Sequence, residues 1–69
     1  MKSYKITGKL ILGFIFNNDQ HDIVIDSGTL ESDGHTVWFI ELTGKRYEST
    51  TTANVIEDAL ERGRIEPIS

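Results

Sequence analysis

The run Ser49-Thr50-Thr51-Thr52 comes closest to a chemical site in this 69-residue chain. It leads into a stretch with helical spacing, and the first turn of a helix offers free backbone N–H groups and a positive dipole that favour phosphate or carboxylate. One hypothesis is therefore an anion- or nucleotide-binding site made of Lys45, Arg46, Thr50, Thr51 and Thr52. Ordinary helix capping by Thr51 or Thr52 is the favoured interpretation, because no glycine-rich loop accompanies the run.

The other candidate groups form no recognisable catalytic or metal-binding motif. His21, next to Asp22, and His35 lie in or beside predicted turns, at spacings that match no known ligand motif. The chain has no cysteine, which excludes disulfides, thiolate metal sites and cysteine nucleophiles. Serine, histidine and carboxylate side chains are present without a nucleophile elbow, and so short a chain has little room to enclose a substrate. We therefore expect no enzyme activity, no metal and no cofactor.

The charges are unevenly distributed around a net charge of −4. Residues 1–16 carry Lys2, Lys5 and Lys9 and no acid, whereas residues 17–35 carry acids and neither lysine nor arginine. Binding to nucleic acid depends on clustered basic side chains, so nucleic acid is an unlikely partner and these lysines support it only as a weaker alternative. The acidic stretch is interpreted as solvated turns and a solvent-facing strand, with an acidic patch for a basic partner as the alternative.

Alternating apolar and polar residues predict strands in the first two thirds of the chain. Residues 4–16 form either one long curved strand or two strands with a kink, and the polar turn at 17–20 joins them to a strand at 23–25 in a hairpin. Asp33-Gly34 predicts a type I′ turn between strands at 29–32 and 35–42. A turn at Thr43-Gly44 then leads to a strand at 45–49.

One helix is predicted at about 52–62, near the C-terminus, with Asn54, at capping-box spacing from Glu57, as an alternative start. Its apolar face consists of Val55, Ile56, Ala59 and Leu60. A short final strand follows, and Pro67 places it at an edge because proline cannot donate to a ladder. The predicted fold is a single α+β domain over residues 1–69, with a mainly antiparallel sheet of four or five strands and the helix packed on one face. Curling of that sheet into a small barrel is left open.

Nothing in the sequence predicts a membrane segment. The apolar stretch from Leu10 to Phe16 is far shorter than the roughly 20 residues that span a bilayer. It also lacks the cleavage site of a signal peptide, so we expect a soluble, cytoplasmic protein.

The second face of the sheet is the feature most informative about function. One helix covers one face only, and that face is predicted to carry Leu10, Leu12, Phe14, Trp38, Ile40 and Leu42. Ile11, Ile15, Val24, Val37 and Phe39 would then point the other way, where either curling of the sheet or a partner must cover them. The leading hypothesis is a non-enzymatic interaction module whose surface contains Ile11, Ile15, Val37 and Phe39, with a homodimer as the simplest assembly.

Overall fold

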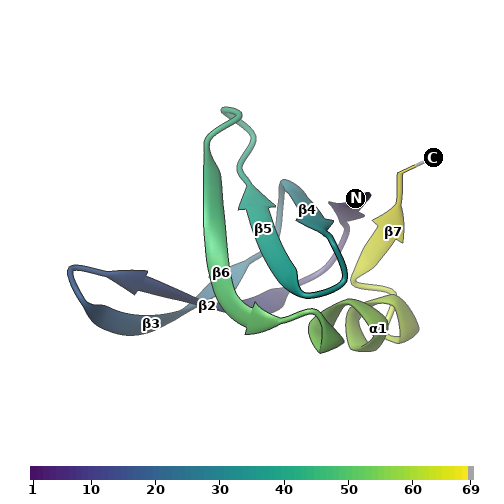
Figure 1. Cartoon of the computed structure of the whole chain (residues 1–69). Coiled ribbons are helices and arrows are strands. Elements are labelled where there is room, and N and C mark those ends of the chain that lie inside the picture. Colours follow the sequence, from purple (N-terminus) through teal and green to yellow (C-terminus); the bar gives the residue numbers. More distant parts are fainter. Residues whose placement is uncertain (69) are drawn as a thin grey trace.

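A computed structural model of the chain describes residues 1–68 and contains two antiparallel sheets and one helix (Figure 1). The first sheet has five strands in the order β6-β5-β4-β1-β7, and the second is the hairpin β2-β3. The elements are β1 (Lys2–Ile6), β2 (Leu10–Phe16), β3 (Asp19–Ile25), β4 (Thr29–Ser32), β5 (Thr36–Ile40), β6 (Arg46–Thr52), α1 (Asn54–Glu61) and β7 (Ile65–Pro67). The predicted α+β class is confirmed, with the helix near the C-terminus and a short strand after it.

The N-terminal apolar region is two strands, so the kinked alternative is the correct one. The break lies at Gly8, where the N–H groups of Thr7 and Gly8 both donate to the carbonyl oxygen of Arg64, at 2.8 and 2.9 Å. These bonds satisfy backbone groups that a continuous strand would pair with a neighbouring strand. They also turn the chain out of the five-stranded sheet, so that β2 begins the separate hairpin.

A turn at Asp33-Gly34 joins β4 to β5 as predicted, but it is not the predicted type I′ turn. Ser32 lies opposite Val37, which leaves four residues between the strands, and only Gly34 of the two turn residues has a positive φ, whereas a type I′ turn requires it at both. Gly34 has a φ of 97°, which only glycine adopts readily. The Asp33 carboxylate accepts hydrogen bonds from the backbone N–H groups of His35 and Thr36, at 2.9 and 2.8 Å. The turn is therefore held by a side chain as well as by its glycine.

We expect the pKa of Asp33 to lie below its ordinary value of 3.8, because the N–H groups of Thr36 and His35 stabilise the charged carboxylate. The stabilising contribution is present above the unfolded-state pKa and is lost as the pH falls through the folded-state pKa. A carboxyl-carbon NMR titration should give a midpoint below 3.8, and in Asp33→Ala this part of the acid sensitivity should disappear. A midpoint at or above 3.8 would show that the two bonds do not form in solution.

The start of the helix differs from the prediction. β6 continues through Thr52, which lies opposite Thr36 of β5, and Ala53 occupies the N-cap without a side-chain hydrogen bond. The predicted threonine cap is therefore wrong, whereas the helix predicted at about 52–62 is present and spans Asn54–Glu61. Threonine suits a strand as well as a cap, and here the pairing with β5 determines which of the two it joins.

The assignment of β5 side chains to the two sheet faces was also wrong. Val37 is fully buried and Phe39 packs against the core, whereas Trp38 and Ile40 lie on the opposite, outer face and Leu42 is exposed after the strand. The core lies between the five-stranded sheet, the hairpin and one side of α1. It comprises Tyr4, Ile6, Leu10, Leu12, Phe14, Ile25, Leu30, Val37, Ile56, Ala59 and Ile65.

The sheets curl toward each other without closing into a barrel. β2 passes beside β6, but the two strands belong to separate sheets and share no backbone ladder. β2 lies against the β5–β6 end of the five-stranded sheet, where the Phe14 ring contacts those of Phe39 and Tyr47. The core that includes Val37 and supports Phe39 is therefore completed within one chain. At the far edge of that sheet lies β7, as Pro67 predicted.

Candidate interaction surface

The β2–β3 hairpin projects from one side of the molecule (Figure 1). Its strands pair from Leu10 opposite Ile25 to Phe16 opposite Asp19. A two-residue turn joins them, with φ values of 50° at Asn17 and 67° at Asn18. Asparagine tolerates this left-handed region better than most residues, so the polar turn seen in the sequence produces a tight hairpin.

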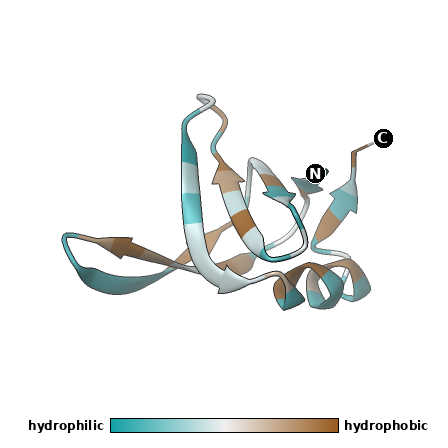
Figure 2. Ribbon diagram, viewed as in Figure 1, coloured by the Kyte–Doolittle hydropathy of each residue, from teal (hydrophilic) through white to brown (hydrophobic). Residues whose placement is uncertain are grey.

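The two faces of the hairpin differ sharply in burial. Leu10, Leu12 and Phe14 point inward and are buried. On the opposite side, which we call the outer hairpin face, Ile11 is 64% exposed, Ile15 59% and Val24 62%. In Figure 2 the projecting hairpin is largely hydrophobic along β2 and hydrophilic along the outer part of β3.

The residues of the outer hairpin face follow from the strand register. Ile11 lies directly opposite Val24, Gly13 opposite Asp22, and Ile15 opposite Gln20. Because side chains alternate between faces, these three pairs share one side of the hairpin. The face therefore has an apolar pair near its base, an acidic group in its middle and a third apolar side chain toward its tip.

A close contact at Gly13 holds the hairpin against β6. The N–H of Gly13 donates to the Thr51 hydroxyl at 2.8 Å, and its carbonyl accepts from the Ser49 hydroxyl at 2.7 Å. A Cβ atom at position 13 would lie 2.5 Å from Gln20 Nε2 and 2.6 Å from Thr50 Oγ1. The strands thus approach closely because position 13 has no side chain, and hydroxyl groups take the place of a backbone ladder.

The predicted interaction surface is divided between two parts of the structure. Ile11 and Ile15 are exposed together on the outer hairpin face, whereas Val37 is fully buried and Phe39 is half-buried, packed against the core. Val37 therefore cannot form part of a surface. Val24, predicted on the same face as Ile11 and Ile15 but not included in the predicted surface, lies directly opposite Ile11 and is exposed with it.

The residues of the predicted anion site are not brought together. Lys45 and Arg46 lie at the opposite end of β6 from Thr52. Lys45 Nζ lies 5.3 Å from the centroid of the Tyr47 ring, and Arg46 Cζ lies 4.9 Å from that of Trp38.

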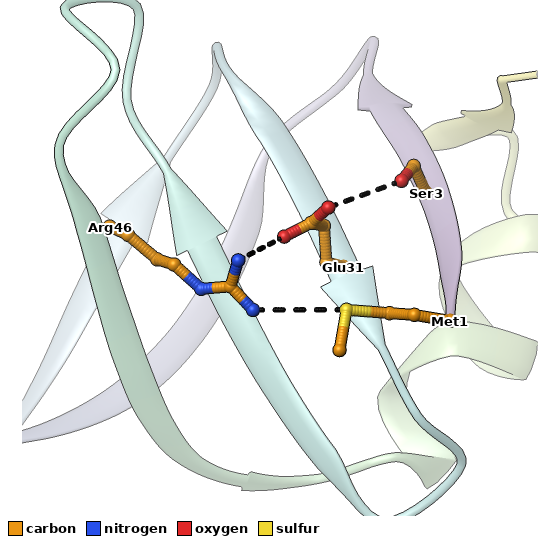
Figure 3. Close-up of polar contacts among 4 residues, drawn as sticks. All are labelled: Met1, Ser3, Glu31 and Arg46. Carbon is orange, nitrogen blue, oxygen red and sulfur yellow. Dashed lines mark hydrogen bonds and ion pairs between the residues drawn. The ribbon is translucent and has the colours of Figure 1, made fainter.

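Arg46 is also engaged on the outer face of the five-stranded sheet (Figure 3). Its Nη1 lies 2.8 Å from the Glu31 carboxylate, which also accepts a bond from the Ser3 hydroxyl, and its Nη2 lies 3.7 Å from Met1 Sδ. Thr51 binds Gly13, and Thr50 exchanges hydrogen bonds with the Gln20 amide. These partners compete with any anion for both the charges and the hydroxyl groups.

The three N-terminal lysines do not form a basic patch on one strand. Lys2 and Lys5 are an odd number of residues apart on β1, so their side chains leave opposite faces of the sheet. Lys9 lies in the connection between β1 and β2. The alternative of nucleic-acid binding through a single lysine-rich strand face thus has no continuous surface.

A hollow of about 550 Å³ lies between β1, the β4–β5 turn and the start of α1. Lys2, Asp33 and Glu57 are among its lining residues, so charges of both signs meet there and favour neither an anion nor a cation. Among residues 1–68, no three histidine or acidic side chains are grouped closely enough to hold a metal ion. No helix in the same range is long and apolar enough to cross a bilayer.

The outer hairpin face thus exposes three apolar side chains, of which Ile11 and Val24 are cross-strand neighbours and Ile15 lies one pair beyond Asp22 on the same side. Comparison with family models, curated proteins and solved structures finds no match to this chain.

Proposed function

We propose that this protein is a non-enzymatic interaction module that docks another protein on the outer hairpin face. The observation that carries the proposal is the exposure of Ile11, Ile15 and Val24 on one side of a projecting hairpin. Single exposed apolar residues are common on protein surfaces, but a neighbouring group is typical of a binding site. Full burial of each such side chain in a complex is worth roughly 1.5–3 kcal/mol.

The charges on this face favour a different protein over a second copy of the chain. Asp22 lies between the apolar pair at the base and Ile15 toward the tip. A twofold axis through the middle of the face would bring two Asp22 carboxylates together, and burial of unpaired like charges is strongly unfavourable. A partner with apolar side chains and a positive charge would bury the same surface and pair with Asp22. We therefore expect the isolated chain to be monomeric.

Selection of random linear peptides on the immobilised protein tests the proposal. We expect the selected peptides to bind Ile11→Gln/Val24→Gln at least about tenfold more weakly than the unaltered protein, because both apolar anchors are lost. The variant should fold normally, since both side chains are mostly exposed and the net charge is unchanged. Isothermal titration of synthetic peptides measures the difference.

Leu42→Gln is the matched control, because Leu42 is 83% exposed and lies outside the hairpin. It should bind the selected peptides as the unaltered protein does. Equal binding by all three proteins, or a selection that enriches no peptide, would contradict the proposal. A stable dimer in light scattering that Ile11→Gln/Val24→Gln dissociates would instead identify a second copy as the occupant and overturn the choice of partner.

A further inference from the structure

The free edge of β3 is a second feature of the hairpin, distinct from its outer face. β3 pairs with β2 on one side and with no described strand on the other. Six of its seven residues are exposed. Strands in such positions are usually protected by charged side chains, proline, a bulge or a covering segment. Of these, β3 in the described chain has only the acidic side chains of Asp19 and Asp22.

The backbone groups that face this edge can be identified from the contacts of Gly13. Its N–H and carbonyl bind Thr51 and Ser49 on β6, so they point away from β3. Gly13 and Asp22 are therefore a non-hydrogen-bonded pair of the hairpin, and the N–H and C=O of Asp22 point away from β2. Because these directions alternate along an antiparallel strand, the N–H and C=O groups of Gln20 and Val24 also point away from β2. Gln20, Asp22 and Val24 together present three backbone donors and three backbone acceptors along the edge of β3.

The side chains at this edge combine apolar and acidic character. Val24 is 62% exposed on the outer hairpin face, and Ile23 is 37% exposed on the inner one. Asp19 and Asp22 lie on the same strand, and the chain has no lysine or arginine between residues 10 and 44. The acids disfavour the pairing of β3 with β3 of a second copy and favour a strand that carries positive charge.

We infer that the partner supplies an extended segment that adds to the free edge of β3, with lysine or arginine opposite Asp22 and apolar residues opposite Ile23 and Val24. The inference rests on the proposed function and names the partner of the same hairpin. Strand addition uses main-chain hydrogen bonds for affinity and alternate side chains for specificity. Both requirements are met here, by the free groups at Gln20, Asp22 and Val24 and by the side chains beside them.

The test uses a synthetic peptide whose antiparallel alignment with residues 19–25 is complementary to β3. The sequence Thr-Val-Val-Lys-Thr-Thr-Lys, with blocked ends, places lysines opposite Asp22 and Asp19 and valines opposite Val24 and Ile23. Its charge-reversed control has glutamate in place of both lysines. A second control keeps every side chain but is N-methylated at the two residues opposite Asp22 and Val24, which removes the N–H groups needed for pairing.

We expect the lysine peptide to bind at least about tenfold more tightly than either control in an NMR titration at low salt. Bound peptide should slow the amide exchange of Gln20, Asp22 and Val24. The amides of His21 and Ile23 should change little, because they already bond to β2. Asp22→Lys should abolish the preference between the lysine and glutamate peptides, because each would then make one opposite-charge and one like-charge pair with residues 22 and 19.

Equal binding of the lysine and N-methylated peptides, or unchanged exchange at Gln20, Asp22 and Val24, would overturn the inference. If peptides selected on the intact protein still depended on Ile11 and Val24, the proposed function would stand and only strand addition would be wrong. If peptide binding depended neither on Ile11 and Val24 nor on the peptide N–H groups, both proposals would fail.

Discussion

Gly28→Ala should lower the free energy of unfolding by about 3–5 kcal/mol, because the new methyl group meets both strain and overlap. Gly28 has a φ of 104°, in the region that disfavours every residue with a Cβ atom. A Cβ atom there would lie 2.6 Å from the carbonyl oxygen of Ile40, a backbone atom that cannot rotate away, and 2.9 Å from the Phe39 ring. For a domain of this size, with a total stability of roughly 3–10 kcal/mol, this loss would remove about a third or more of the stability and in the lower part of the range all of it.

Gly34→Ala separates the effect of backbone strain from that of atomic overlap. Gly34 has a φ of 97°, close to that of Gly28, but a Cβ atom there would have no neighbour within 4 Å. This variant should lose only the strain, about 1–2 kcal/mol. Urea unfolding followed by tryptophan fluorescence measures both, with Trp38 as the probe. Equal losses in the two variants would mean that Gly28 does not approach the end of β5 as described.

Leu12→Ala should cost about 2–5 kcal/mol, because it leaves a cavity in the core between the hairpin and the five-stranded sheet. Leu12 is fully buried, whereas its neighbour Ile11 is 64% exposed. Ile11→Ala should therefore cost less than about 1 kcal/mol, the range of strand propensity and of the lost contact with Val24. The same unfolding measurement serves for both variants.

This pair of substitutions tests which face of the hairpin points outward. Adjacent residues of a strand lie on opposite faces, so a shift of one residue in the packing would exchange their roles. A larger loss for Ile11→Ala than for Leu12→Ala would place Ile11 in the core and remove the candidate surface altogether.

The local elements of this fold could be predicted because their signals lie within a few residues. Asp33-Gly34 marks the β4–β5 turn by residue type alone, and the spacing of Ile56 and Ala59 indicates the buried side of the helix. Pro67 indicates an edge strand for the same local reason. Each of these predictions depends on backbone chemistry that does not change with the rest of the fold.

The division of β5 side chains between core and surface could not be predicted in the same way. Both faces of the strand are apolar, with Val37 and Phe39 on one and Trp38 and Ile40 on the other. Alternation therefore gives no preference, and the choice depends on the position of the hairpin. The inner face is the one that the hairpin covers, whereas the outer face is stabilised by the contact of Arg46 with Trp38 and by its ion pair with Glu31.

The end of β6 is a second case in which distant contacts determine local structure. Thr50 and Thr51 would serve equally in a cap or a strand, and their hydroxyls are engaged by Gln20 and Gly13 from the hairpin. These contacts join residues about thirty or more positions apart in the chain, so no short sequence window contains them. The candidate site was predicted in part for the same reason: the common face of Ile11, Ile15 and Val24 follows from alternation within the hairpin, whereas the burial of Val37 depends on contacts distant in the chain.

Chemical-shift mapping tests the central claim most directly. The ¹⁵N-labelled protein would be titrated with the tightest peptide obtained by selection on the unaltered chain. The largest amide shift changes are expected at Ile11, Ile15 and Val24 and their neighbours in the hairpin. Changes confined to the hollow around Lys2 and Asn54, with the hairpin signals unmoved, would contradict the assignment of the outer hairpin face as the binding surface.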